Sequence, residues 1–251
     1  MSIHTPAEEA NWFGNRPVDP MEKTGLVRQV FDRVADRYDL MNDLMSGGVH
    51  RLWKTRFIRA LTPRPDQILL DVAAGTGDIA AGWRGAGGGP AVLCDINEAM
   101  LCKGRDRSLD RGQLAGLSWV VGNAESLPFP ERSFDAYTIA FGLRNVTDID
   151  AALAEARRVL KPGGRFFCLE FSQVAIPAFR RLYDFYSNAV IPRLGQIVAR
   201  DRESYEYLVE SIRRFPAQRD LVQRIGTAGF ALARYSDLSG GIAAIHRAYR
   251  T

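Results

Sequence analysis

The hydrophobic and polar positions along the chain follow two different periods. Between residues 22 and 60, apolar side chains recur at helical spacing, and Ser46-Gly47-Gly48 interrupts the pattern. After a stop at residues 62–65, short apolar runs alternate with amphipathic stretches. This alternation predicts strands followed by helices, which is typical of a parallel, doubly wound sheet. The expected strands are 68–72, 91–95, 118–121, 134–140 and 165–171.

The end of the chain departs from this alternation. A long helical, basic stretch reaches to about Gly226, and strand-like runs follow at 231–235 and 242–248. Only six residues, 236–241, lie between these two runs. We therefore expect them to pair antiparallel, because a parallel crossover needs about a dozen residues or more. The predicted fold class is α/β, a doubly wound, Rossmann-like sheet of seven strands with an antiparallel C-terminal pair and a helical cap at the N-terminus.

The same pattern suggests how the chain is divided. We expect a flexible N-terminus at residues 1–21, a helical cap at 22–61 and the main domain at 62–251. Within the main domain, residues from about 174 to 226 form a helical insertion. In its part 176–198, apolar side chains alternate with arginines, which suits a membrane-surface helix as well as ordinary core packing.

Composition adds an uneven charge to this picture. The 251 residues are 46% hydrophobic and 25% charged, typical of a globular protein, and no apolar run approaches the roughly 20 residues that span a bilayer. The start of the chain is acidic and unlike a signal peptide, so we expect a cytoplasmic protein. Residues 174–251 carry 12 arginines against 7 carboxylates, within a net charge of +4. This basic third could face nucleic acid, anionic lipid or an acidic substrate, or could be a solvated helical surface.

The cysteines and histidines do not predict a metal site. Cys94, Cys102 and Cys168 have no C-x-x-C spacing, and the three histidines are far apart. Cys94 and Cys168 lie inside apolar runs and are expected to be small buried hydrophobic residues.

The candidate chemistry centres on the turn after the first strand, residues 71–77 (DVAAGTG). Its glycines, Gly75 and Gly77, let the backbone approach a ligand at the carboxyl edge of the sheet, where open α/β folds bind nucleosides. Asp95 ends the next strand, where a carboxylate can accept the two ribose hydroxyls. The glycines alone also fit a nicotinamide dinucleotide. Asp71, however, suits a ligand with a cationic end such as an ammonium group better than a pyrophosphate.

Two more glycine-containing motifs follow later in the chain, each beside a predicted strand. Gly122-Asn123-Ala124-Glu125 follows the third strand, and Lys161-Pro162-Gly163-Gly164 precedes the fifth. Together with the glycine turn they resemble the class I S-adenosylmethionine methyltransferases, whose sheet also ends in an antiparallel pair. The resemblance implies that Asn123 and Ala124 lie along the adenine.

Further stretches narrow the resemblance. They are VFDRVADRYDLMNDLMSGGVHRLWK at 30–54, FGLRNVTD at 141–148, LEFS at 169–172, and residues 201–213 and 240–247. These look like the ubiquinone/menaquinone biosynthesis C-methyltransferase family (UbiE type), and the similarity runs from about residue 22 to the end. It implies transfer of a methyl group from S-adenosylmethionine to a ring carbon of a prenylated quinol. That quinol would be a demethylmenaquinol, a 2-polyprenyl-6-methoxy-1,4-benzoquinol, or both.

The resemblance also implies where the cofactor binds. The family's contacts fall on Thr76, Asp95, Asn123 and Ala124, and its usual serine is replaced here by Ala140, where only backbone contact could remain. The complete predicted cofactor-binding set is Asp71, Gly75, Thr76, Gly77, Asp95, Asn123, Ala124 and Ala140.

The expected chemistry needs alignment and a phenolate. The sulfonium methyl is already electrophilic, so the protein must mainly align donor and acceptor. A phenol has a pKa near ~10, and a nearby cation lowers it. We predict that Arg144 is this cation, that Asn145 orients the oxygen, and that Tyr38, or less readily His50, relays the proton. Alternatively, Arg144 forms a structural ion pair with a carboxylate such as Asp148, and Tyr38 is a packed aromatic residue.

Other functions stay open at this point. A methyltransferase of the same fold could act on a soluble small molecule, and a nicotinamide-dependent oxidoreductase is a less favoured reading. A nucleic-acid-binding protein is the least favoured, because no recognition motif accompanies the basic third. Besides the quinol, the expected partners are the inner face of the cytoplasmic membrane, contacted at its surface, and a second copy of the chain or a quinone-biosynthesis complex. Nucleic acid is not an expected partner.

Overall fold

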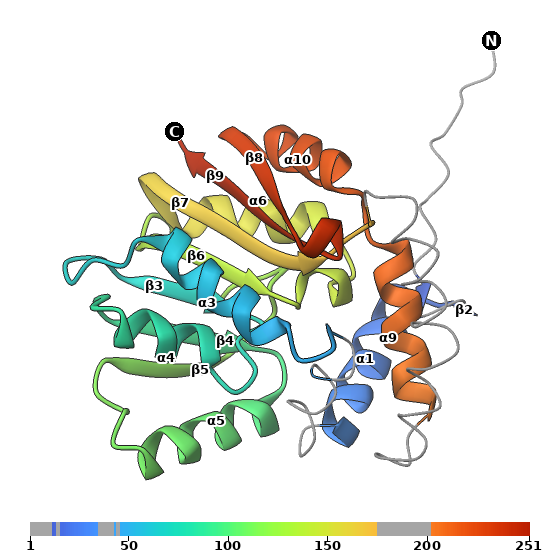
Figure 1. Cartoon of the computed structure of the whole chain (residues 1–251), viewed down its shortest axis with the longest axis horizontal. Coiled ribbons are helices and arrows are strands. Elements are labelled where there is room, and N and C mark those ends of the chain that lie inside the picture. The colour runs from blue at the N-terminus through green and yellow to red at the C-terminus, as the bar shows by residue number, and fades with distance from the viewer. Residues whose placement is uncertain (1–11, 14–15, 35–42, 44–45, 175–201) are drawn as a thin grey trace.

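The central element of the computed structural model is a sheet of seven strands in the order β5-β4-β3-β6-β7-β9-β8 (Figure 1). The structure describes residues 12–13, 16–34, 43, 46–174 and 202–251. The strands are β3 (Leu69–Val72), β4 (Ala91–Asp95), β5 (Leu117–Val121), β6 (Phe134–Ala140), β7 (Leu160–Phe171), β8 (Phe230–Leu238) and β9 (Ala243–Arg250). Strands β3 to β7 are parallel, and β9 runs antiparallel to both β7 and β8. The predicted fold class is confirmed.

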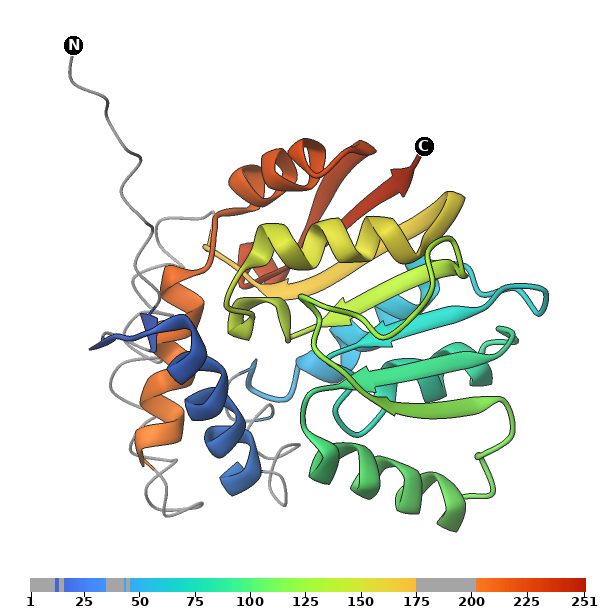
Figure 2. The same ribbon diagram turned by 180° about the vertical axis from the view of Figure 1, so that it is seen from behind.

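Helices cover both faces of this sheet (Figures 1 and 2). One face carries α3 (His50–Leu61), α4 (Asp78–Gly85) and α5 (Glu98–Asp110), and the other carries α6 (Ile149–Val159) and α10 (Gln218–Thr227). Successive side chains of a strand point to opposite faces. Leu69 therefore packs in a cluster with Phe57 of α3, whereas its neighbour Leu70 packs with Leu153 of α6. A core on each face fixes the register of the central strands.

Two further helices lie beside each other at the carboxyl edge of the parallel strands (Figures 1 and 2). They are α1 (Pro20–Val34) and α9 (Arg202–Arg214). A short antiparallel pair, β1 (Trp12–Phe13) and β2 (Arg16–Pro17), precedes α1 and was not predicted. The Phe13 ring stacks on Tyr207 of α9 at 4.4 Å between centroids. A segment that precedes the sheet and a helix that lies between β7 and β8 in the chain thus meet over the edge at which a ligand would bind.

Strand β7 shows the largest difference at the start of a strand between the structure and the sequence prediction. Strand β7 begins at Leu160, five residues before the expected start at Arg165. Its pairing with β6 shifts register between Phe134 and Ala136, and Gly163 has a φ of 78°. The Lys161–Gly164 motif is therefore an irregularity inside the strand, which only a glycine at Gly163 accommodates easily.

The helical stretch before Gly226 contains α9 and α10, and the proposed membrane-surface segment 176–198 lies outside the described residues. Cys94 and Cys168 are buried, as predicted.

Candidate functional site

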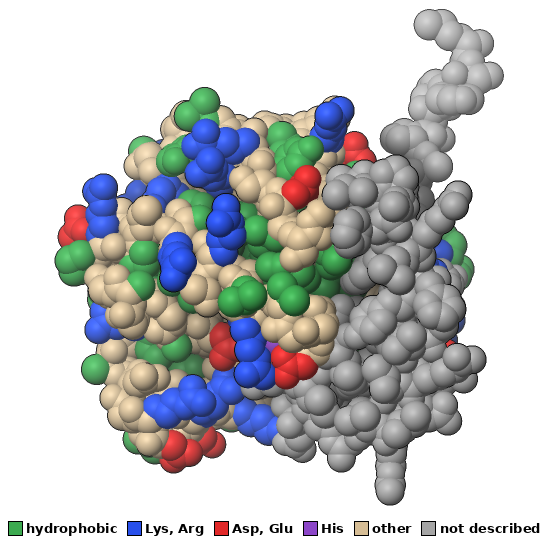
Figure 3. Space-filling view, viewed as in Figure 1, with side chains coloured by type: hydrophobic (Ala, Val, Ile, Leu, Met, Phe, Trp, Pro, Cys, Tyr) green, Lys and Arg blue, Asp and Glu red, His purple; other side chains and the backbone are tan. Residues whose placement is uncertain are grey.

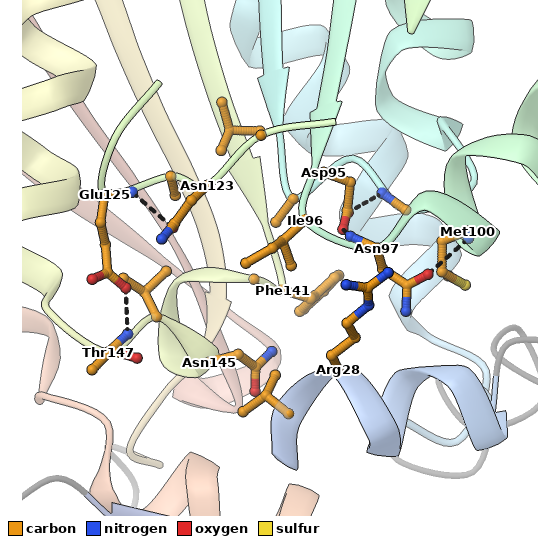
Figure 4. Close-up of a pocket in the computed structure, with 18 residues that line it drawn as sticks. Arg28, Asp95, Ile96, Asn97, Met100, Asn123, Glu125, Phe141, Asn145 and Thr147 are labelled. Atoms are coloured by element: carbon orange, nitrogen blue, oxygen red, sulfur yellow. Dashed lines mark hydrogen bonds between the residues drawn. The ribbon is translucent and has the colours of Figure 1, made fainter. Parts of the chain in front are cut away.

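A pocket lies at the carboxyl edge of the sheet, between the strand ends and α1 (Figure 4). Four successive loops and one helix line it. The lining consists of Val72, Ala73 and Gly75 at and after the end of β3, Asp95, Ile96, Asn97 and Met100 from the end of β4 to the start of α5, Gly122, Asn123, Ala124 and Glu125 after β5, Phe141, Gly142, Asn145, Val146 and Thr147 after β6, and Val27 and Arg28 of α1. We call this the main pocket. The topology thus brings together Gly75, Asp95, Asn123 and Ala124 from the predicted cofactor set.

Asp95 is held rigidly at the rim of the main pocket. The Gly75 N–H donates to its Oδ2 at 2.7 Å, and the Asn97 N–H donates to its Oδ1 at 2.8 Å. Burial raises the pKa of Asp95, and these backbone donors oppose the shift. Asn97 in turn caps α5, since its Oδ1 accepts from the Met100 N–H at 3.0 Å. The carboxylate therefore ties the glycine turn to the start of α5.

Asn123 and Glu125 order the opposite wall. The Asn123 Oδ1 accepts from the Glu125 N–H at 3.0 Å, and the Glu125 Oε1 accepts from the Thr147 N–H at 2.8 Å (Figure 4). The loop after β5 is thereby bonded to the turn after β6. This turn is a short 3-10 helix, Leu143–Asn145.

A smaller pocket lies on the other side of the glycine turn. It shares Ala73 and Phe141 with the main pocket and is also lined by Asp71, Thr76 and Ala140. The Thr138 hydroxyl donates to Asp71 Oδ1 at 2.8 Å, whereas Oδ2 is buried with no hydrogen-bond partner among the described residues. Burial raises the pKa of Asp71 to about 7, against the lowering effects of the Thr138 hydrogen bond and of the Ala80 backbone. A buried carboxylate oxygen without a donor fits a cationic ligand group.

Charged side chains from three helices surround the glycine turn on this side. The Arg107 Nη2 donates to Thr76 Oγ1 at 2.6 Å and to Asp78 Oδ1 at 3.0 Å. The Lys54 Nζ donates to Asp78 Oδ2 at 2.7 Å and lines the smaller pocket. Gly77, in the left-handed region at φ 84°, is the N-cap residue directly before α4. Sequence reasoning missed Lys54 and Arg107; Lys54 ends the family-like stretch 30–54, which was the available signal.

The predicted catalytic residues separate in space. Asn145 lines the main pocket, but Arg144 is not among its lining residues. Arg144 instead forms a buried ion pair with Glu170, 2.6 Å from Nη1 to Oε1. The alternative prediction, a structural ion pair with a carboxylate, is confirmed, with Glu170 in place of Asp148 as the partner. Asp148 instead caps α6 by accepting from the Ala151 N–H. Tyr38 lies outside the described residues.

His50, the second choice for proton relay, is buried at the start of α3. Its Nδ1 lies 3.2 Å from the Ser46 hydroxyl and 3.4 Å from an oxygen of Asp43. It lines neither the main nor the smaller pocket. Its contacts are those of a residue that anchors the helix start.

The model of the ubiE/COQ5 methyltransferase family matches residues 19–250. The chain belongs to this family. It is 55% identical to the ubiquinone/menaquinone biosynthesis C-methyltransferase UbiE of Acidiphilium cryptum, over 95% of this chain and 96% of that protein. It is also 49% identical to the mitochondrial 2-methoxy-6-polyprenyl-1,4-benzoquinol methylase of Mus musculus, over 95% of this chain and 84% of that protein.

Solved structures with low sequence identity share the fold of this ubiE/COQ5 family member. The cyclase SpnF superposes with a TM-score of 0.67 at 18% identity, covering 93% of this chain and 97% of that one. A methyltransferase from Thermotoga maritima, dependent on S-adenosylmethionine, superposes with a TM-score of 0.64 at 20% identity, over 90% of this chain and all of that one. Because a cyclase and a methyltransferase share this sheet, the likeness to solved structures speaks for the fold alone.

The described residues include neither a metal site nor a membrane-spanning helix. In these parts of the chain, no group of three or more His, Cys, Asp and Glu side chains is arranged to hold a metal ion. Nor does any helix described here have the length and apolarity to cross a membrane.

Proposed function

We propose that the chain transfers a methyl group from S-adenosylmethionine to a ring carbon of a prenylated quinol in ubiquinone or menaquinone biosynthesis. The observation that carries this proposal is the 55% identity, over 95% of the chain, to relatives named for that reaction. The similarity includes both the sheet and the helices at its carboxyl edge, since the family model extends from residue 19 to 250.

The two pockets, which share the lining residues Ala73 and Phe141, fit the proposed cofactor. Asp95, fixed by two backbone donors, would accept the ribose hydroxyls, and Asn123 and Ala124 would lie along the adenine. In the smaller pocket, the unpartnered Oδ2 of Asp71 would take the ammonium group of the methionine end, near Thr76 and the backbone of Ala140. Gly75 and Gly77 add no side chain of their own to the turn beside the two pockets.

The geometry also refines the proposed roles at the substrate. S-adenosylmethionine supplies an electrophilic methyl carbon, so the protein has to orient the quinol and favour its phenolate. Asn145 lines the main pocket and would donate a hydrogen bond to the ring oxygen. Arg144 would act indirectly, without touching the substrate, because its ion pair with Glu170 holds the turn that carries Asn145. A role for Tyr38 in proton relay is retained as part of the proposal.

Two regions would complete the site. Val27 and Arg28 of α1 line the main pocket, and its other lining residues belong to the sheet domain. This supports the proposed division into a cap at residues 22–61 and a cofactor-binding domain at 62–251.

A lipid substrate would reach the protein at a membrane surface. On the face seen in Figure 3, Lys and Arg side chains lie among hydrophobic ones. Helix α3, which Figure 1 shows from the same side, has the exposed residues Arg51, Leu52, Arg56 and Arg59. Such a mixture suits an anionic lipid surface.

Binding and turnover test the proposal separately. Calorimetry should show binding of S-adenosylhomocysteine and none of NAD; binding of NAD alone would exclude the proposal. Incubation with labelled S-adenosylmethionine should then label demethylated prenyl quinols and leave soluble phenols unlabelled. Label only on the soluble phenols would favour the small-molecule alternative. Quinone profiling of a strain that lacks the protein should show a demethylated quinone, which would identify the ring as benzoquinol or naphthoquinol.

A further inference from the structure

A tyrosine of the C-terminal helices reaches the turn at the main pocket. Tyr207 of α9 and Asn145 after β6 are 62 residues apart, yet the Tyr207 hydroxyl donates to Asn145 Oδ1 at 3.1 Å. Tyr207 is 3% exposed. Burial raises the pKa of its phenol above the ordinary value, so the hydroxyl keeps its proton at neutral pH and remains a donor.

This hydrogen bond determines which end of the Asn145 amide faces the pocket. A carboxamide offers one acceptor oxygen and one NH₂ donor on opposite sides. With the oxygen held by Tyr207, the nitrogen is turned toward the pocket, as Figure 4 shows. In the described part of the chain, Asn145 Nδ2 donates no hydrogen bond, so it is available to a ligand.

Further contacts hold both partners of this hydrogen bond in place. The Tyr207 ring stacks on Phe13 with an interplanar angle of 18°. The Asn145 backbone N–H donates to the Gly142 carbonyl at 3.0 Å, and the preceding residue, Arg144, is anchored by Glu170. A rigid pair of this kind holds a donor in place at little reorganisation cost during a reaction.

We propose that Tyr207 is a positioning residue, whose hydroxyl fixes the Asn145 amide so that its NH₂ group donates to the quinol oxygen beside the methylated carbon. The inference rests on the proposed function. The donated hydrogen bond strengthens as negative charge develops on that oxygen, so it favours the transition state more than the bound quinol. Tyr207 itself touches neither the cofactor nor the substrate in this assignment.

Tyr207→Phe tests the proposal with a minimal change, because it keeps the ring that stacks on Phe13 and removes only the hydroxyl. We expect kcat with a demethylated quinol to fall about tenfold, the effect of one neutral hydrogen bond. KM for S-adenosylmethionine and the affinity for S-adenosylhomocysteine should stay within about twofold of wild type. The matched control is Tyr235→Phe on β8, whose ring packs against His246. It should retain the wild-type kcat.

A double-mutant cycle separates positioning from a merely structural effect. If Tyr207 acts through Asn145, Tyr207→Phe should cost nothing further in an Asn145→Ala background. An equal tenfold loss in that background would overturn the proposal, as would a wild-type kcat for the single variant. Failure of the proposed function would look different, because the wild-type protein itself would then methylate no quinol. In that case the inference about Tyr207 would be rejected together with the proposed function.

Discussion

The guanidinium of Arg144 lies 2.6 Å from the carboxylate of Glu170, and both side chains are at most 2% exposed. Glu170 Oε1 also accepts from the Phe171 N–H at 2.8 Å, and Arg144 Nη1 donates to the Phe141 carbonyl at 2.7 Å. Burial raises the pKa of Glu170, while Arg144 opposes the shift. The ion pair therefore connects the turn after β6 to β7. Removing one partner would leave the other charge buried without a counter-ion.

Replacing Arg144 should destabilise the fold. Arg144→Met leaves Glu170 buried without its partner, and such a loss costs about 3–5 kcal/mol. Adding Glu170→Gln removes the stranded charge and keeps an acceptor for the Phe171 N–H, so the double variant should be more stable than Arg144→Met alone. Urea unfolding followed by circular dichroism gives the free energies.

The control for this prediction is an exposed ion pair. Arg51 lies 2.8 Å from Asp43 with 68% of its side chain exposed, and Arg51→Met should cost less than about 1 kcal/mol. If Arg144→Met cost no more than Arg51→Met, the pair would not be structural, and Arg144 would again be the candidate cation of the reaction.

Removing the charge of Asp95 should weaken cofactor binding. Asp95 accepts hydrogen bonds from the backbone N–H groups of Gly75 and Asn97. In Asp95→Asn, the side-chain NH₂ group would face one of these two donors, and that hydrogen bond would be lost. A hydrogen bond to a charged group contributes about 1.5–3 kcal/mol, so the affinity for S-adenosylhomocysteine should fall at least about tenfold. Asp106→Asn, an exposed carboxylate on α5, should bind like wild type. Equal affinities for the two variants in calorimetry would remove Asp95 from the site.

Cofactor binding should depend on pH through Asp71. Burial places the pKa of Asp71 at about 7, so the carboxyl is mostly protonated at pH 6 and ionised at pH 8. An ammonium ligand favours the ionised form. Its affinity should therefore rise with pH, by up to about tenfold between pH 6 and 8. Calorimetry with S-adenosylhomocysteine measures this trend, which Asp71→Asn should abolish and the exposed Asp66→Asn should keep.

Stability should respond to Asp71 in the opposite direction. The folded-state pKa is raised above the ordinary 3.8, so the protonated carboxyl contributes stability that is complete below about pH 4 and is lost as the pH rises through about 7. The free energy of unfolding of wild type relative to Asp71→Asn should thus decrease from pH 4 to 8. A difference that stayed constant with pH would show that Asp71 is ionised throughout.

The sequence predicted the sheet because strand alternation is a local signal. The runs at 91–95 and 134–140 match β4 and β6 in full, and the helix after Asp148 begins at the predicted cap. The start of β7 was missed because a strand that bulges at Gly163 has the residues of a turn. The β1–β2 pair was missed because its packing depends on Tyr207, a residue almost 200 positions away.

The cofactor-binding residues were predictable because each lies in a short motif directly after a predicted strand. Gly75, Asp95, Asn123 and Ala124 meet because the carboxyl ends of parallel strands share an edge. The partner of Arg144 was not predictable, since Glu170 lies 26 residues away and approaches only through the pairing of β6 with β7. Nor could spacing show that Arg107 bonds Thr76 or that Tyr207 bonds Asn145. Side-chain contacts between elements depend on how those elements dock.

Gly104 on α5 should support the cofactor site without lining either pocket. A Cβ built there would lie 2.7 Å from the Thr76 carbonyl oxygen and 2.7 Å from the Trp119 ring, so the glycine turn rests directly against the helix. Gly104→Ala should cost about 1–3 kcal/mol in stability and weaken S-adenosylhomocysteine binding by moving the turn. Gly85→Ala, at the end of α4 with no atom within 4 Å of the added Cβ, should instead be neutral or stabilising by up to about 1 kcal/mol. If both variants bound S-adenosylhomocysteine like wild type, the position of the turn would not control cofactor affinity.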